Sequence, residues 1–331
     1  MNQVKRRDVL ALLGSVPAAW PLLTFAEAPE RMRRIGVVMA YAEEDPNGQI
    51  QIGAFREHLP KLGWIEGSNV TIDVRYARGD PARAREMAAE LLRQRLDLIV
   101  SNSNLVTTIL QTQVRTIPLV FVSVSDPVGS GFVKDLARPG GNITGFANFP
   151  PSMGSKWLEK LHEVAPQAER VGLLLHPEPP NLGYLKSAQE AAPLLNLRLV
   201  DLRVHDRAEI ESAFTTFVGD ARSGLIVAPN IVSFANSALI VALAAKYRLP
   251  SIYPFAFFAR EGGLISYGFD EREQFRQGAV YVDKILRGAK PAELPVQYPT
   301  KFEIVVNLKT AKALGLDVPL QVQQFADTII E

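Results

Sequence analysis

The stretch FVSVSDPVGSGFVKDLARPGGNITGF, residues 121–146, starts as an apolar run and ends in a glycine-rich segment. Its first residues complete a buried strand predicted over 118–123. Ser123, Ser125 and Asp126 stand at or just after the carboxyl end of that strand, where open parallel sheets bind their ligands. Two interpretations are open. The stretch is either a catalytic edge, or the wall of a binding cleft that is followed by a crossing into a second lobe.

Outward from this strand, short apolar runs alternate with helical patterns in the first half of the chain. The predicted strands are residues 34–40, 70–76, 97–101 and 118–123, and the predicted helices are residues 47–62, 81–96 and 104–115. Strands and helices that alternate in this way form a parallel sheet with helices on both faces. We therefore expect an α/β lobe here.

The same alternation restarts in the second half. The predicted strands are residues 170–176, 197–204, 224–229, 249–255 and 263–269, and the predicted helices are residues 183–195, 207–218 and 234–247. A long helix over 271–286, an extended segment over 294–308 and a short helix over 309–316 follow. Glycines 140, 141 and 145 and prolines 150 and 151 mark residues 142–152 as the first crossing between two similar lobes.

Composition narrows the possible classes of protein. A chain of 331 residues has room for about two domains, and 47% hydrophobic residues supply a sizeable core. The net charge of +1 argues against a broad nucleic-acid or membrane-surface footprint. The chain has no cysteine, which excludes disulfides, thiol nucleophiles and cysteine-ligated zinc.

Residues 1–28 have the layout of an export signal peptide, with a basic start, an apolar stretch and small residues at its end. Arg6 and Arg7 resemble a twin-arginine signal, and an ordinary Sec signal is the alternative. Cleavage after Ala26 or after Ala28 fits the pattern. No other segment approaches 18 uninterrupted apolar residues, so we expect an exported mature chain that does not span a membrane.

Polar and aromatic residues follow many of the predicted strands. They are Tyr41, Glu43, Glu44, Asp45, Ser101, Asn102, Ser103, Asn104, Ser123, Ser125, Asp126, His176, Asn181, Asn230, Ser233, Tyr253, Phe255, Ser266, Tyr267 and Asp270. Each has a structural alternative. The serines, asparagines and aspartates could cap helices or turns, and the aromatic residues could belong to the core.

Catalytic signatures are missing from the sequence. It contains no phosphate-binding loop, no His-Glu-x-x-His motif, no Gly-x-Ser-x-Gly elbow and no dinucleotide fingerprint after the first strand. No helix-turn-helix precedes the α/β body. We therefore expect no enzyme, no metal site, no cofactor and no nucleic-acid partner.

Several long blocks resemble the solute-binding proteins of ABC importers, in the tryptophan/tyrosine-binding-protein-like family. The blocks are residues 117–146, WLEKLHEVAP at 157–166, residues 262–316 and the closing QQFADTIIE. The resemblance implies the type I periplasmic-binding-protein fold, in which two Rossmann-like lobes with parallel sheets are joined by a hinge of three crossings.

Mapped onto this chain, the resemblance implies an N-terminal lobe of residues 31–147 plus 270–297 and a C-terminal lobe of 148–269 plus 300–331. The crossings would fall near Phe146–Asn148, Gly268–Asp270 and Tyr298–Phe302. The ligand-binding positions it implies are Tyr41, Ser103, Asn104, Ser123, Ser125, Asp126, Asn148, Tyr253 and Tyr267.

The expected function is capture of an amino acid or aromatic-like small molecule by hinge closure, followed by delivery to an ABC permease in the inner membrane. A ligand carboxylate would bind to helix N-termini and to Ser123 or Ser125, and a ligand ammonium to Asp126 or Asp270. We expect a monomer. A ligand-sensing module that serves a membrane receptor is the first alternative, and an exported α/β enzyme that uses Asp126 or Glu43 as a base is the second.

Overall fold

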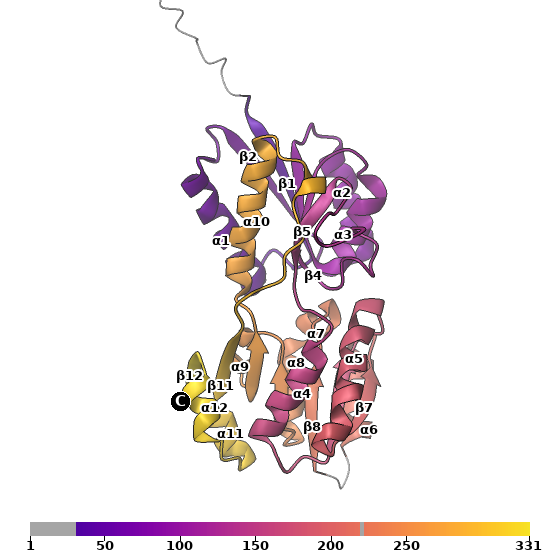
Figure 1. Cartoon of the computed structure of the whole chain (residues 1–331), viewed down its shortest axis with the longest axis vertical. Helices are drawn as coiled ribbons and strands as arrows, with labels where there is room; N and C mark the ends of the chain where they lie inside the picture. Colours follow the sequence, from indigo (N-terminus) through magenta and orange to yellow (C-terminus); the bar gives the residue numbers. More distant parts are fainter. Residues whose placement is uncertain (1–30, 219–221) are drawn as a thin grey trace, which may run out of the picture. The chain divides into compact units, whose positions relative to one another are not determined.

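The structure is a computed structural model that describes residues 31–218 and 222–331. The described residues form two α/β lobes, each built on its own sheet (Figure 1). The predicted signal peptide, residues 1–28, lies outside the described residues. None of the helices in the described ranges combines the length and the apolar character needed to cross a membrane.

The first lobe is built on a five-stranded sheet in the order β2-β1-β3-β4-β5, and all of its strand pairs are parallel. The strands are β1 (Arg33–Met39), β2 (Val70–Tyr76), β3 (Leu98–Asn102), β4 (Leu119–Val124) and β5 (Ile143–Ala147). The helices around it are α1 (Pro46–His58), α2 (Pro81–Leu92), α3 (Ser103–Gln113) and α10 (Glu271–Leu286), with 3-10 turns at Leu59–Leu62 and Pro291–Glu293.

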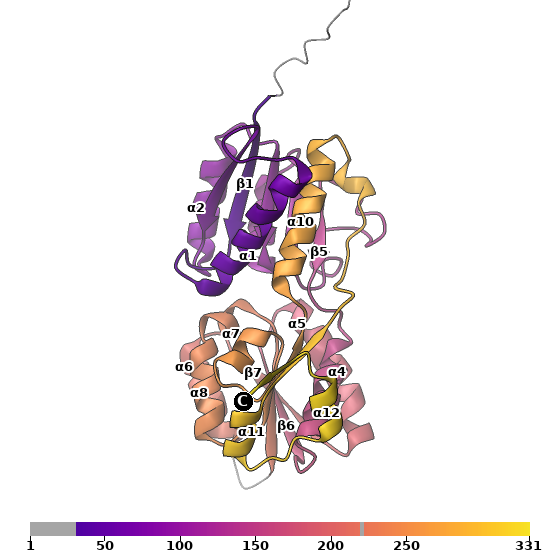
Figure 2. The same cartoon turned by 90° about the vertical axis from the view of Figure 1, so that its left-hand side faces the viewer.

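Alternation along the strands gives this sheet two apolar faces. In β1, Val37 and Met39 pack into the core cluster under α1 and α10, whereas Val38 packs into the cluster under α2 and α3. Helices α1 and α10 lie side by side on their face, although they are far apart in the sequence (Figures 1 and 2). The first lobe is therefore completed only by a helix from late in the chain.

The second lobe is built on a seven-stranded sheet in the order β12-β11-β10-β9-β8-β6-β7. The strands are β6 (Arg170–Leu175), β7 (Arg198–Arg203), β8 (Ser223–Val227), β9 (Ser251–Tyr253), β10 (Ile265–Gly268), β11 (Glu303–Asn307) and β12 (Thr328–Ile330). Of the pairs among these described strands, only β10 with β11 is antiparallel. The sheet is thus dominated by parallel pairs, as the predicted fold class requires, but it is not purely parallel.

Eight helices of the described chain belong to the second lobe: α4 (Met153–Val164), α5 (Pro179–Ala191), α6 (Arg207–Phe217), α7 (Ile231–Ala235), α8 (Ser237–Lys246), α9 (Ala256–Arg260), α11 (Leu308–Leu314) and α12 (Leu320–Phe325), with a 3-10 turn at Ala192–Leu195. Helix α4 packs on α5, and α6 packs on α8. Figure 2 shows α6 and α8 on the opposite side of the sheet from α4. The single helix predicted over 234–247 is in fact the pair α7 and α8.

The chain passes between the two sheets three times. It leaves β5 for α4, leaves β10 for α10, and returns from α10 to β11 through residues 294–302. The sequence predicts an extended segment over 294–308, and within it only β11, Glu303–Asn307, is a regular strand. Before that strand Gln297 bridges to β5, where its backbone carbonyl accepts a hydrogen bond from the N–H of Ala147 at 2.8 Å. We call these three passages the connections.

Strand β5 occupies residues that the sequence assigned to the first crossing. Gly145 lies inside β5 with φ 152°, and a Cβ atom there would stand 2.0 Å from the carbonyl oxygen of Phe121. The glycine therefore permits β5 to approach β4 closely. The interpretation that Gly145 serves the crossing is wrong, because its conformation is needed one step earlier, within the sheet.

Candidate functional site

Loops that follow strands of both sheets meet at a pocket of about 40 Å³, which we call the strand-end pocket. From the first lobe it is lined by Ser103, Asn104, Leu105, Ser123, Ser125 and Asn148, and from the second lobe by Glu178, Asn181, Pro229, Asn230, Ile231 and Phe234. The arrangement follows from topology, because the carboxyl ends of parallel strands share one edge of a sheet.

Ser123 is turned toward the pocket by an irregularity in β4. The register between β4 and β5 shifts between Val122 and Val124, and Ser123 itself has φ 61°. A bulge of this kind redirects a side chain at the cost of local strain. The Ser123 hydroxyl is buried and has no hydrogen-bond partner among the described residues, so it is available to a ligand.

Asn104 fixes the loop that follows β4. Its Oδ1 accepts a hydrogen bond from the backbone N–H of Ser125 at 2.9 Å, and its Nδ2 donates to the carbonyl oxygen of Ser125 at 2.8 Å and to the hydroxyl of Ser130 at 3.0 Å. The amide of Asn104 is therefore a structural clamp at the pocket wall. Both the ligand-contact and the structural interpretation of this residue are compatible with its position.

Ser125 and Asn148 form a buried polar pair that also contacts the second lobe. The Ser125 hydroxyl donates to Oδ1 of Asn148 at 3.0 Å, and the hydroxyl of Tyr184 in α5 donates to the Ser125 oxygen at 3.3 Å. Burial raises the pKa of Tyr184, so this phenol remains a neutral donor. A hydrogen bond of the pocket wall thus joins the two lobes directly.

The second-lobe side of the pocket carries two asparagines, an acid and an aromatic ring. Asn181 donates to the carbonyl oxygen of His176 at 2.8 Å, and Asn230 caps α7 by accepting from the N–H of Ser233 at 2.8 Å. Glu178 is the acidic residue of the lining, and Phe234 packs edge-on against Phe255 with ring centroids 5.3 Å apart.

The structure therefore gathers five of the nine predicted ligand positions around one pocket: Ser103, Asn104, Ser123, Ser125 and Asn148. Asp126 lies outside the lining, and its carboxylate accepts a hydrogen bond from the N–H of Gly129 at 2.9 Å. This is the turn role that the sequence offered as its alternative.

The three predicted tyrosines also stand apart from the lining. Tyr41 is buried in the first-lobe core, and its hydroxyl accepts from Gln51 at 3.1 Å. Tyr253 is buried in the second-lobe core and stacks on Phe258, with 4.9 Å between ring centroids. Tyr267 packs against Phe302, 5.6 Å between centroids. All three have the core packing that competes with ligand contact for any aromatic residue.

None of the six lining residues of the second lobe is among the nine predicted positions, although the sequence offers a signal for two of them. Asn181 and Asn230 follow predicted strands, but the family resemblance does not include them. Glu178 precedes the helix that was predicted to begin at residue 183 and in fact begins at Pro179. Phe234 lies one helical turn beyond a strand end, where no strand-end rule selects it.

No cluster of three or more histidine, cysteine, aspartate or glutamate side chains suited to a metal ion occurs within residues 31–218 and 222–331. The pocket holds one carboxylate, from Glu178, and otherwise neutral donors and acceptors. Its chemistry is that of recognition through hydrogen bonds.

Two α/β lobes with three connections and a polar pocket between strand ends define a binding protein of the type I periplasmic fold. The chain belongs to the family of ABC transporter substrate binding proteins, whose family model matches residues 36–330. The family is described by substrate binding, which agrees with a pocket built for recognition.

Similarity to individual proteins agrees with this assignment. A tyrosine-binding protein of Clostridioides difficile is 24% identical over 289 residues, which cover 87% of this chain and 82% of the relative. A conserved domain protein of Vibrio cholerae has a TM-score of 0.82 at 26% identity, covering 90% of this chain and 100% of the other. An ABC domain from Streptococcus pneumonia in complex with L-Trp has a TM-score of 0.84 at 23% identity, covering 90% and 99%.

Proposed function

We propose that this protein captures an aromatic amino acid in the strand-end pocket and delivers it to an ABC permease. The observation that carries the proposal is the pocket itself, which draws unsatisfied or adaptable polar groups from both lobes. Relatives named for tyrosine and for a complex with L-Trp support the ligand class.

Capture requires the lining residues to move apart and close again. The strand-end pocket has a volume of about 40 Å³. One water molecule needs about 10–15 Å³ of pocket volume, so the pocket as it stands would hold only a few waters and no amino acid. An amino acid enters when the lobes separate about the three connections and is enclosed when they return. The hydrogen bond from Tyr184 to Ser125 is one that this movement would break and remake.

The residues around the pocket suggest how the ligand would be held. A carboxylate would accept from the Ser123 hydroxyl and from backbone N–H groups at the start of α3. Glu178 would pair with the ammonium group, since Asp126 and Asp270 do not line this pocket. Phe234 would cover the aromatic side chain.

The remaining steps of the proposal concern the cell. Export by the twin-arginine or Sec signal would place the mature chain in the periplasm, where a monomer would meet its permease. A sensory role would use the same capture step. The enzyme alternative loses its proposed bases, because the Asp126 carboxylate caps a turn and Glu43 is exposed outside the pocket.

Calorimetric titration of the purified protein against the twenty amino acids tests the proposal. We expect micromolar binding of tyrosine, tryptophan or phenylalanine, which corresponds to about −8 kcal/mol. Ser123→Ala should weaken that binding about tenfold, and Ser155→Ala, at a half-buried position of α4 outside the pocket lining, should not change it. Absence of heat and of thermal stabilisation across the panel would contradict the amino-acid assignment.

A further inference from the structure

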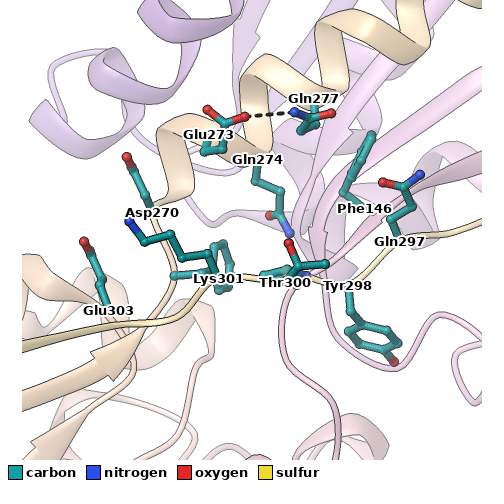
Figure 3. A pocket seen from close by; sticks show the side chains of 12 residues that line it. Phe146, Asp270, Glu273, Gln274, Gln277, Gln297, Tyr298, Thr300, Lys301 and Glu303 are labelled. Carbon is teal, nitrogen blue, oxygen red and sulfur yellow. Dashed lines mark hydrogen bonds between the residues drawn. The ribbon is translucent and has the colours of Figure 1, made fainter. Parts of the chain in front are cut away.

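A second cavity lies beside the first turns of α10, and its volume is about 560 Å³ (Figure 3). This volume falls within the range of about 300–1,000 Å³ that is usual for small-molecule sites. Its walls come from Phe146 in β5, from Phe269 and Asp270 on the connection between β10 and α10, and from the connection that leads to β11, together with Glu303 at the start of that strand. We call it the connection cavity.

Gln274 places an unsatisfied acceptor in this cavity. The side chain is directed from α10 into the cavity, and the residue is only 5% exposed (Figure 3). Its Nε2 donates to the carbonyl oxygen of Ala147 at 2.7 Å, which fixes the orientation of the amide. Its Oε1 is buried and has no hydrogen-bond partner within residues 31–218 and 222–331. A buried acceptor without a donor is destabilising, so a ligand that donates a hydrogen bond here is favoured.

The charges around the cavity favour a cation. The lining contains the carboxylates of Asp270, Glu273 and Glu303 and one ammonium group, that of Lys301. Asp270 and Glu273 are already paired with Arg272 at 2.9 Å and with Arg276 at 3.2 Å.

Glu303 differs from those two acids. It makes no ion pair with the described residues, and it is half-buried at the start of β11. Burial and the negative charge of Asp270 both raise the pKa of Glu303. A cation beside it would replace solvation that the carboxylate has lost.

The wall of the connection cavity also has an apolar part, which a ligand must match. The rings of Phe146 and Phe269 line the cavity, and both residues are buried. A ligand with an N–H donor, a positive charge and an apolar body would satisfy each group in turn. We propose that the connection cavity binds a small organic ammonium ion, with its N–H groups at Gln274 and Glu303 and its apolar part against Phe146 and Phe269.

This site goes beyond the capture of an amino acid and does not depend on it. Because the occupant would contact two of the three connections and strand β5, it would favour whichever arrangement of the lobes fits it best. Because the strand-end pocket is lined by both lobes, an occupant of the connection cavity would thereby change the affinity of that pocket for its own ligand.

Titration of the whole purified protein with 2-phenylethylammonium chloride, followed by NMR, tests the proposal. The neutral analogue 2-phenylethanol has nearly the same shape and serves as the matched ligand. We expect the ammonium ion to bind at least tenfold more tightly than the alcohol. Glu303→Gln and Gln274→Met should each weaken it at least tenfold, whereas Glu163→Gln on the exposed face of α4 should leave it unchanged.

In the unmodified protein, contacts between ligand protons and the rings of Phe146 and Phe269 provide a readout that needs no variant. Equal affinity for the two ligands, no binding of either, or unchanged affinity in Glu303→Gln would overturn the proposal. Loss of the ammonium ion in Ser123→Ala but not in Glu303→Gln would also overturn it, because it would place the ion in the strand-end pocket. Titration with amino acids is a separate experiment that tests the strand-end pocket. Either proposal can therefore be contradicted without affecting the other.

Discussion

On the first-lobe side of the strand-end pocket, Ser103 and Ser123 hold left-handed backbone conformations, with φ 70° and 61°. On the second-lobe side, Asn230 is extended at φ −159° and caps a helix in the ordinary way. Residues other than glycine with positive φ do occur in the second lobe, at Asn196 and Arg248, but neither lines the pocket. The first-lobe side of the pocket, which we call the first wall, therefore has a strained backbone that is held in place by hydrogen bonds. The second-lobe side, the second wall, includes the helix cap Asn230, whose backbone is unstrained and can adjust.

Strain of this kind persists only when neighbouring contacts enforce it. The clamp of Asn104 on Ser125 and the close packing of β5 on β4 supply those contacts. We infer that the first wall keeps its shape while the second wall adapts to the ligand. Three substitutions test this contrast, and a fourth, at Glu271, tests how the stability of the protein depends on pH.

Gly145→Ala should have the largest effect, because its Cβ atom would collide with the carbonyl oxygen of Phe121 and its φ of 152° disfavours a side chain. We expect a loss of about 3 kcal/mol or more in the free energy of unfolding, measured by urea denaturation. Gly141→Ala is the control, since nothing lies near its Cβ position. Similar midpoints for the two variants would show that β5 is not fixed by this contact.

Asn104→Ala removes three hydrogen bonds that hold the loop after β4. We expect a loss of about 2 kcal/mol in stability and a larger loss in ligand affinity than Asn230→Ala causes. The second variant removes a helix cap worth about 1 kcal/mol. Calorimetry and urea denaturation on both proteins measure the two effects. Equal losses of affinity would remove the distinction between a clamped and an adaptable wall.

Glu271→Gln should alter the dependence of stability on pH. The Glu271 carboxylate accepts a hydrogen bond from Gln51 at 2.9 Å, and burial together with the charges of Asp270 and Asp45 raises its pKa to about 8. The folded protein then keeps the proton while the unfolded chain loses it above about pH 4.5. Stability should therefore be full below that pH, should fall as the pH rises to about 8, and should then level off.

The slope is limited to about 1.4 kcal/mol per pH unit for one group. Urea midpoints at pH 5, 7 and 9 measure it, and Glu271→Gln should flatten the profile. Glu273→Gln, exposed in the same helical turn, is the control and should retain the slope. A wild-type profile that rises between pH 5 and pH 8 would contradict the assignment of this group.

Ser123→Gly should have the smallest effect on stability, a gain of about 0.5–1 kcal/mol from relief of its left-handed backbone. It should weaken ligand binding nevertheless, because the unpaired hydroxyl is lost. Asn196→Gly relieves the same kind of backbone far from the pocket and should leave affinity unchanged. Differential scanning calorimetry and ligand titration separate the two effects. Unchanged affinity in Ser123→Gly would exclude the hydroxyl from the site.

The sequence predicts most elements of this fold because each has a local cause. Alternating β-branched residues define β2 at Val70–Tyr76, and Asp270 followed by an amphipathic pattern defines α10 at Glu271–Leu286. Strand β5 was missed since its glycine and its flanking glycine-rich turn look like a crossing. Only the packing on β4 explains why a glycine belongs inside that strand.

The sequence predicts the candidate site only in part. The strand-end rule finds Ser123, Ser125 and Asn148 because topology alone places them. It does not find Phe234, which owes its position to the first turn of α7, and it selects Tyr253, whose ring turns into the core. The direction of a side chain depends on neighbours that are distant in the sequence, and a single sequence does not specify them.

The late position of α10 in the chain has a consequence for biosynthesis. Translation proceeds from the N-terminus, so the apolar face of β4 and β5 that α10 covers stays exposed until residue 286 has been made. The second sheet is completed later still, because its strands β11 and β12 are formed by residues 303–307 and 328–330. The first lobe therefore cannot finish folding before residue 286 has been made, nor the second before residue 330, and protease sensitivity of ribosome-bound chains of increasing length would reveal that delay.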